Sequence, residues 1–154
     1  MIHSLDSVIR EHSFFRGLDE KYIQFLVGCA RNTKFEEDQH IFSEGDSADR
    51  FYFIRDGVVS IEMVVPHRGP TILQTLSDGD VLGWSWLTPP YRWHFGARAL
   101  RRTRALDFDG KCLREKCEED HDLGYEILKR FANVVTDRLD STRLQLLDLY
   151  GATA

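Results

Sequence analysis

The spacing of apolar residues changes twice along this chain of 154 residues. Between about residues 5 and 31 the spacing is helical, with a second run starting at Asp19. From Lys34 the period shortens to about two, which is typical of β-strands, and from about Gly110 it is helical again. The pattern predicts two short helices, a set of short strands and a helical end.

Turn sequences divide the middle of the chain into short strands. Glycine-containing turns recur about every 8 to 12 residues, at residues 44–46, 55–57, 67–70 and 77–80. The strands expected between and after them are residues 51–54, 58–65, 71–76, 97–100 and 103–108. Such spacing is typical of sandwiches and barrels of antiparallel strands. The sequence therefore predicts a mainly β fold with flanking helices, a small antiparallel β-barrel followed by a long helix.

The final helix is expected to run from about Leu123 to Leu149, roughly 40 Å at 1.5 Å per residue. It would outreach a barrel whose domain has a radius of gyration of about 15 Å. We expect residues 1–120 to form the N-terminal helices and the barrel, and residues 121–154 to form the long helix of the same domain. His121 and Asp122 are read as the N-terminal cap of this helix.

One face of the final helix repeats at alternating steps of 4 and 3 residues, the spacing of a coiled-coil seam. The seam consists of Leu128, Ala132, Val135, Leu139, Thr142, Leu146 and Leu149. An overhanging apolar face needs a partner, and a second copy of the chain is the simplest one. The spacing predicts a parallel homodimer, with packing of the seam onto the chain's own N-terminal helices as the alternative.

The segment from Gly83 to Phe95 interrupts the strand pattern and is the part of the chain densest in aromatic residues. It carries Trp84, Trp86, Tyr91, Trp93 and Phe95 around two consecutive prolines. If the segment is extended, Trp84 and Trp86 share a face. The aromatic side chains are expected either to line a pocket for an apolar or planar ligand or to fill that space as core.

Charge and cysteine content narrow the class of protein. The formal net charge is −5, and no run of apolar residues approaches the roughly 18 needed for a membrane span. Because the first six residues also lack the basic-then-apolar layout of a secretory signal, we expect the protein to be soluble and cytoplasmic. Three cysteines without CxxC spacing predict neither a disulfide framework nor a zinc site, so we expect them to be reduced. A basic cluster, Arg98, Arg101, Arg102 and Arg104, is read as a solvated hairpin or as a contact for an anion or a partner.

The order of these elements resembles the cyclic-nucleotide-binding domain of the Crp/Fnr sensor family, and three local motifs agree. Residues 14–18, Phe-Phe-Arg-Gly-Leu before a helix, look like the family's entry. Residues 41–59 resemble its central strand-and-turn signature, with Gly45 and Gly57 at turn positions, and residues 77–83 resemble the approach to its ligand cassette. The resemblance covers about residues 14 to 149 and implies a β-barrel sensor that is not an enzyme.

The resemblance also indicates what this cassette lacks. In the family a Glu after the first Gly holds the ribose and an Arg neutralises the cyclic phosphate. Here Trp84 follows Gly83, and counting back from Ala99 with one gap places Trp93 at the Arg position and Phe95 at the following Ala. A buried phosphate without its cation costs several kcal/mol. We therefore expect that cyclic AMP and cyclic GMP do not bind in the usual way.

The alternative is genuine nucleotide binding in which Arg92 or Arg98 holds the phosphate. The candidate cassette residues are Gly83, Trp84, Ser85, Trp86, Leu87, Arg92, Trp93, Phe95 and Arg98. Two functions remain open: a ligand sensor whose dimer helix reports occupancy to a protein partner, and a ligand-free interaction domain with a filled pocket.

Cofactors, metal and catalysis are not expected. The candidate haem ligands are His67, His94 and Cys112, but no two of them have the spacing of a ligand pair. An iron–sulfur cluster needs four cysteines, and the chain has three. The catalytic motifs of hydrolases, zinc proteases, P-loop proteins and dinucleotide enzymes are absent. Without a recognition helix and with net negative charge, direct DNA binding is not expected. Residues 148–151 resemble the hinge that precedes the DNA-binding domain in the family's regulators.

Overall fold

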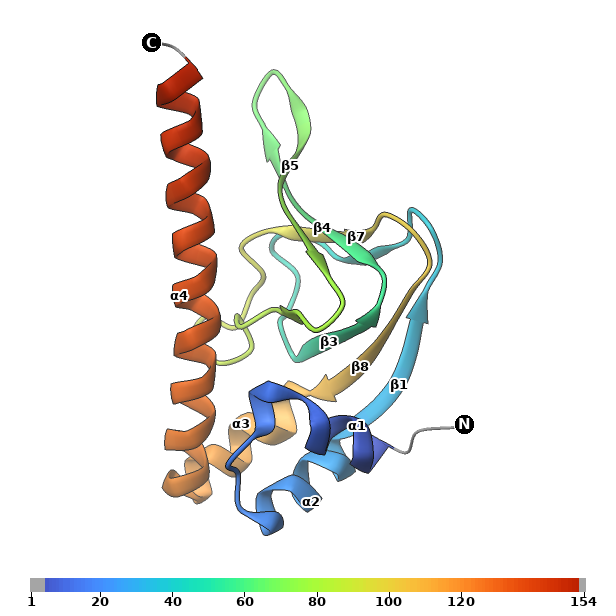
Figure 1. Ribbon diagram of the computed structural model, residues 1–154, viewed down its shortest axis with the longest axis vertical. Coiled ribbons are helices and arrows are strands. Elements are labelled where there is room, and N and C mark those ends of the chain that lie inside the picture. Colours follow the sequence, from blue (N-terminus) through green and yellow to red (C-terminus); the bar gives the residue numbers. More distant parts are fainter. Residues whose placement is uncertain (1–4, 153–154) are drawn as a thin grey trace.

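A computed structural model describes residues 5–152 of the chain, with α4 forming a column beside a compact barrel (Figure 1). Residues 1–4 of the predicted segment 1–120, and residues 153–154 of the predicted segment 121–154, lie outside the described residues. The helical elements are α1 (Leu5–Glu11), the short 3-10 helix η1 (Ser13–Phe15), α2 (Glu20–Cys29), α3 (Gly110–Glu119) and α4 (His121–Ala152). The strands are β1 (Ala30–Phe35), β2 (His40–Phe42), β3 (Arg50–Asp56), β4 (Val58–Val65), β5 (Gly69–Ser77), β6 (Val81–Leu82), β7 (Gly96–Ala99) and β8 (Thr103–Asp109).

The strands form two four-stranded antiparallel sheets, with the orders β1-β8-β3-β6 and β2-β7-β4-β5. Neighbours in the sheets are mostly distant in sequence, as in a jelly roll. The tight β3–β4 connection depends on Gly57, because a Cβ there would lie 2.2 Å from Thr103 Oγ1. The predicted fold class, an antiparallel barrel with flanking helices and a long final helix, is confirmed.

Two separate apolar cores lie on the two faces of the first sheet. The helix-side core joins α1, α2, α3 and the lower part of α4 to the face that carries Phe51, Phe53 and Phe108. The barrel core lies between the two sheets and contains Tyr52 and Ile54, which alternate with the phenylalanines along β3. β3 is therefore buried on both faces.

Two expected boundaries are wrong. The helical run predicted to reach residue 31 ends at Cys29, and β1 begins at Ala30, because pairing with β8 holds this polar segment in a sheet that its own sequence does not favour. The cap of α4 is Asp120, not His121 or Asp122: its carboxylate accepts the Leu123 N–H at 3.2 Å. The predicted start of the second helix at Asp19 is confirmed, since Asp19 caps α2 through the Lys21 N–H at 3.2 Å.

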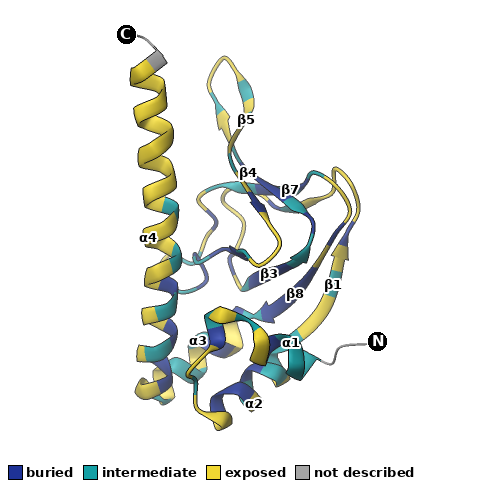
Figure 2. Cartoon of the chain, in the orientation of Figure 1, coloured by how far each residue is buried: buried dark blue, intermediate teal, exposed yellow. Residues whose placement is uncertain are grey.

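α4 has two halves with opposite surroundings. Its lower half packs Leu123, Ile127 and Phe131 into the helix-side core, and all three are at most 2% exposed. Figure 2 shows the upper half almost wholly exposed beside the β4–β5 hairpin. The large exposed apolar residues of α4 are Tyr125, Leu128, Val135, Leu139, Leu144, Leu146, Leu147, Leu149 and Tyr150.

Candidate functional site

The segment expected to hold a ligand, residues 83–95, is a chain of turns and not an extended strand. Residues 85–87 form a turn closed by the Leu87 N–H on the Trp84 carbonyl at 3.0 Å. The geometry in which Trp84 and Trp86 would share a face is therefore not present. The turns instead send successive aromatic side chains in different directions.

Trp93 lies inside the barrel core and is 4% exposed. Its ring stacks on Phe42 with centroids 3.7 Å apart and planes 7° from parallel. Two backbone hydrogen bonds fix its place: the Trp93 N–H donates to the Asp46 carbonyl at 3.0 Å, and the Gly45 N–H donates to the Trp93 carbonyl at 2.8 Å. The residue at the expected phosphate position is thus a buried, ordered indole.

Gly83 makes room for that indole. Its φ of +98° is in the region that favours glycine, and a Cβ at Gly83 would lie 2.4 Å from Trp93 Cη2. Leu82, immediately before it in β6, also belongs to the barrel core. The start of the cassette and the Trp93 ring are therefore packed directly against each other, with no space between them for a ligand.

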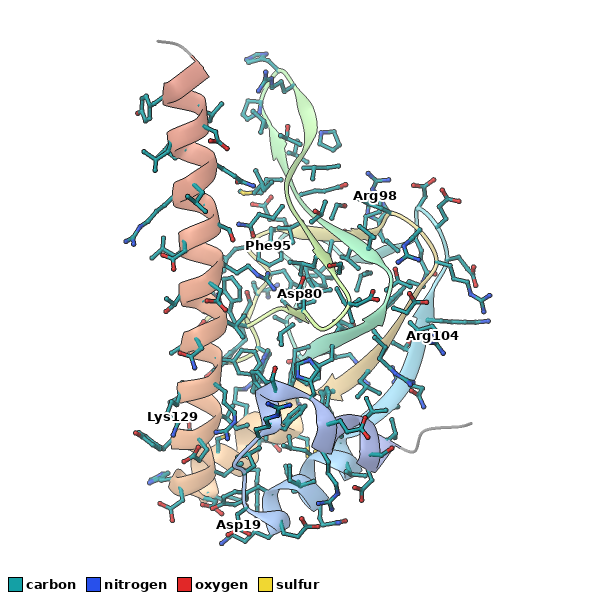
Figure 3. The ribbon with its side chains drawn as sticks, viewed as in Figure 1. Asp19, Asp80, Phe95, Arg98, Arg104 and Lys129 are labelled. Atoms are coloured by element: carbon teal, nitrogen blue, oxygen red, sulfur yellow. The ribbon has the colours of Figure 1, made fainter. Side chains whose placement is uncertain are left out.

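Phe95 and Trp84 continue the aromatic contacts towards α4. The Phe95 ring lies 6.2 Å from both the Trp93 ring and the Trp84 ring. Trp84 is half-buried and packs on the helix-side core. In Figure 3 Phe95 lies on the side of the barrel that faces α4.

Trp86 and Tyr91 are not part of this group. Trp86 is fully buried in the helix-side core, stacked on Phe51 at 4.8 Å and edge-on to Phe131 at 5.3 Å. Tyr91 lies under the Arg114 guanidinium at 3.9 Å. The structure therefore brings together three of the five aromatic side chains of the segment and separates the other two.

The residues on either side of Trp86 in the sequence, Ser85 and Leu87, carry no charge. Ser85 is 1% exposed, and neither its hydroxyl nor the indole N–H of Trp86 has a hydrogen-bond partner among the described residues. Leu87 is half-buried against the helix-side core. No cation from residues 83–87 reaches the barrel, because this segment contains none.

Neither arginine proposed for a phosphate enters the barrel core. Arg98 alternates along β7 with the buried Ala97 and Ala99, so it points away from the core. It is engaged there by Glu62 at 2.8 Å and Asp38 at 2.8 Å. Arg92 is exposed and donates to the Gly45 carbonyl at 2.9 Å.

The carboxylate of Glu62 holds Arg98 strongly. Burial opposes ionisation of Glu62, but hydrogen bonds from Arg98 and Ser60 together keep the pKa of that carboxyl below its ordinary value. Figure 3 shows Arg98 and Arg104 at separate places on the side of the barrel away from α4. The basic cluster read from the sequence is accordingly divided, since Arg98 is paired and Arg101 contacts Asp56 at 3.5 Å.

Arg138 on α4 is a site residue that the sequence reasoning missed. Its guanidinium lies 5.9 Å from the Trp84 ring and donates through Nη2 to the Val81 carbonyl, while Nη1 is buried without a hydrogen-bond partner. Burial lowers the pKa of this guanidinium, and Asp80 and Asp137 act in the opposite direction. The available signal was its position seven residues after the buried Phe131, on the same face of the helix.

Two open cavities flank Arg138 along α4. One, of about 510 Å³, lies between η1, the Gly79–Val81 turn and α4; the other, of about 310 Å³, lies between β5 and α4. Asp80 and Asp137 line both. The cavities border the outside of the barrel and are separate from the space occupied by Trp93.

The seam residues of α4 are all exposed in the single chain. They lie about a quarter turn away from the stripe that packs on the helix-side core. The alternative in which the seam covers the chain's own N-terminal helices is wrong, because Leu123, Ile127 and Phe131 fill that place.

The candidate haem ligands lie far apart. His67 is at the tip of the β4–β5 hairpin, and Cys112 is in α3 at the opposite end of the molecule (Figure 1). Within residues 5–152 no three His, Cys, Asp or Glu side chains are grouped to hold a metal ion. Over the same range, no helix combines the length and apolar character required to cross a membrane.

Comparison with known proteins agrees with this architecture. The family profile of the cyclic nucleotide-binding domain matches residues 32–120. The chain is 24% identical over 145 residues to the CRP-like cAMP-activated global transcriptional regulator of Mycobacterium tuberculosis, covering 94% of this chain and 63% of that protein. It is also 32% identical over 77 residues to the cGMP-dependent protein kinase of Plasmodium berghei, covering 50% of this chain and 8% of the kinase.

Among solved structures, a candidate cyclic nucleotide-binding protein from Geobacter metallireducens superposes with a TM-score of 0.80 and 26% identity, covering 90% of this chain and 99% of that one. The chain belongs to the cyclic nucleotide-binding domain family, and it is a regulatory domain of the Crp/Fnr type. The resemblance inferred from its motifs is confirmed.

Proposed function

We propose that this protein is a non-catalytic regulatory domain whose own Trp93 occupies the space in which the family binds its nucleotide. The observation that carries the proposal is the burial of Trp93, stacked on Phe42 and pressed against Gly83. Cyclic AMP and cyclic GMP then do not bind in the usual way. The regulatory state is set through the outer surfaces and not through an occupied barrel.

Charge supports the same proposal. A cyclic phosphate buried in the barrel needs a cation beside it, because an unpaired buried charge costs several kcal/mol. Arg98 is committed to two carboxylates on the outer face, and Arg92 is tied to the Gly45 carbonyl. Moving either guanidinium inward would break those contacts and displace the indole.

Isothermal titration calorimetry with cyclic AMP and cyclic GMP tests the proposal. We expect no saturable heat at nucleotide concentrations up to about 1 mM, which corresponds to less than about 4 kcal/mol of binding free energy. A micromolar dissociation constant would overturn the proposal. In that event Arg92→Gln and Arg98→Gln, measured in parallel, would show which arginine holds the phosphate, as the alternative of genuine nucleotide binding requires.

Dimerisation through the α4 seam is the second part of the proposal. The seam side chains are exposed and, apart from Thr142, apolar, and α4 continues beyond the barrel, so two copies packed in parallel would cover them. Such a dimer places two barrels at the same end of a helical pair, where a protein partner reads both. The proposal has no catalytic step, and the kinase matched by the chain shares only 8% of its length with it.

A charged pair of substitutions tests the seam. Leu139→Asp combined with Leu146→Asp should convert the dimer to a monomer in size-exclusion chromatography with light scattering, because two buried carboxylates in each helix oppose association. Leu144→Asp is the matched control, since Leu144 is 64% exposed but lies on another side of the helix. An unchanged mass for the double variant, or equal dissociation by the control, contradicts a seam dimer.

A further inference from the structure

Two cysteines from distant parts of the chain meet at the base of the molecule. The sulfur atoms of Cys29 and Cys112 are 3.8 Å apart, although 83 positions separate them in the sequence. Cys29 is the last residue of α2, and Cys112 lies in the first turn of α3. We propose that Cys29 and Cys112 form a redox modification site, a dithiol that a peroxide oxidises to an intramolecular disulfide.

The sheet holds these two helix ends together. Ala30, the residue after Cys29, pairs with Phe108 in the β1–β8 ladder, and α3 follows β8 directly. The backbone of Asp109 and Cys112 is fixed by the cap of α3, in which the Asp109 carboxylate accepts the Cys112 N–H at 2.9 Å. A disulfide requires the sulfur atoms to approach to about 2.05 Å. The closure of under 2 Å is within the reach of side-chain rotation at two helix ends.

The two thiols are placed for different roles. Cys112 is exposed, so a peroxide in solvent can reach it, and it lies in the first turn of a ten-residue helix. The Cys29 thiol is half-buried and donates its hydrogen to the Cys112 sulfur. Burial, and then this hydrogen bond, raise the pKa of Cys29 to about 12, so Cys29 stays protonated while Cys112 reacts.

The chemistry balances with a peroxide as the oxidant. The Cys112 thiolate attacks one peroxide oxygen, the O–O bond breaks, and hydroxide leaves with a proton from solvent as water, which gives a sulfenic acid at Cys112. The Cys29 sulfur then attacks the Cys112 sulfur, loses its proton and releases the sulfenic oxygen as a second water. Two thiols and one hydrogen peroxide become one disulfide and two waters, and a dithiol reductant reverses the change.

Cys117 provides an internal comparison. It lies five residues after Cys112 on the same helix, about 140° around its axis, and packs on the helix-side core. Burial raises the pKa of its thiol to about 11. It is therefore expected to stay reduced when the other two cysteines react.

The consequence of the disulfide would be mechanical. A covalent link between α2 and α3 ties the N-terminal helices to the element that directly precedes α4. It also closes a loop of about 80 residues, which restricts the unfolded chain and raises the thermal midpoint by at least about 5 °C. Oxidation would thus stiffen the base from which the long helix projects.

Intact-mass spectrometry of the purified chain after hydrogen peroxide treatment tests this site. We expect a loss of two hydrogens, a fall in titratable thiols from three to one, and a peptide map that joins Cys29 to Cys112, all reversed by dithiothreitol. Cys117→Ser should behave in the same way. With Cys29→Ser, Cys112 should stop at the sulfenic acid, trapped as a dimedone adduct, and the thermal midpoint should not rise.

Three results would overturn the proposal. They are three free thiols after peroxide treatment, a disulfide that includes Cys117, or disulfides formed only between chains. Because the wild-type peptide map decides between these results, the test does not depend on the folding of a variant. The proposal is independent of whether the barrel binds a nucleotide.

Discussion

Trp86 and Trp93 lie in the same loop, seven residues apart, yet they belong to different cores. Trp86 joins the first sheet to α3 and α4, so its ring is part of what attaches the long helix to the barrel. Trp93 lies between the two sheets, in the space that we propose to be the family's nucleotide site, and it makes its closest ring contact with Phe42. The difference shows that one loop can serve two purposes, attachment of the helix and closure of the barrel.

The largest expected effect tests the attachment of the helix. Trp86→Ala should lower the free energy of unfolding by about 4–5 kcal/mol, because a fully buried ring and its stack on Phe51 are lost together. Denaturant unfolding followed by circular dichroism measures the change. A loss under about 2 kcal/mol would mean that the helix-side core closes over the cavity.

Trp93→Ala should cost less, about 3 kcal/mol, and should leave a cavity shaped like the lost side chain. Added indole is expected to refill that cavity and raise the thermal midpoint of the variant by several degrees, with no effect on the wild type. Trp86→Ala is the matched control, because its cavity lies where α4 packs on the first sheet, and a small shift of the helix can fill it, so added indole should have less effect. An equal response of both variants would remove the distinction between the two cores.

The barrel core also predicts a response to alkaline pH. Burial, helped by the Asp107 carboxylate, raises the pKa of Tyr52 to about 12, above its value of about 10 in the unfolded chain. The unfolded chain therefore loses this proton first, and stability present below pH 10 should fall by roughly 2 kcal/mol as the pH rises to about 12. Urea unfolding of wild type and Tyr52→Phe at pH 9 and pH 11 measures the decrease in the free energy of unfolding. The decrease should be smaller in the variant, and an equal decrease in both proteins would contradict this prediction.

The smallest effect is expected at Arg138. Arg138→Met should change the free energy of unfolding by no more than about 1 kcal/mol. The change should be an increase, because an apolar side chain replaces a cation whose buried Nη1 has no hydrogen-bond partner among the described residues. Arg143→Met on the exposed face is the control, expected within about 0.5 kcal/mol of wild type. A loss above about 2 kcal/mol would show that Arg138 has a partner in solution, such as an anion in the flanking cavities.

Local chemistry explains why most of the fold was predictable. Glycine turns, alternating strands and the Asp19 cap each act over a few residues, so their sequences predict the structure directly. β1 was missed because its polar sequence forms a strand only by pairing with β8, which is remote in the chain. The cap at Asp120 was missed by one position, a common uncertainty at helix ends.

The candidate site was harder to predict, because adjacency in sequence does not determine direction. Five aromatic residues within one segment suggested one cluster, but the turns between them divide the rings between two cores and the surface. The partner of Trp93 is Phe42, from a strand about 50 residues earlier, and no local pattern links the two. For α4, the period predicted a helix with an apolar seam, but only the structure shows that a different stripe contacts the barrel.

The contact between Gly83 and Trp93 restricts the order in which this barrel can change. Any side chain placed first at Gly83 collides with the indole, in a backbone conformation that already disfavours it. Replacing Trp93 with a smaller residue first removes the collision and leaves only the strain of a non-glycine residue at positive φ. Substitutions that make room for a ligand in this barrel are therefore expected to be tolerated in one order only, with Trp93 replaced before Gly83. The effects of the two substitutions on stability are expected to be strongly non-additive.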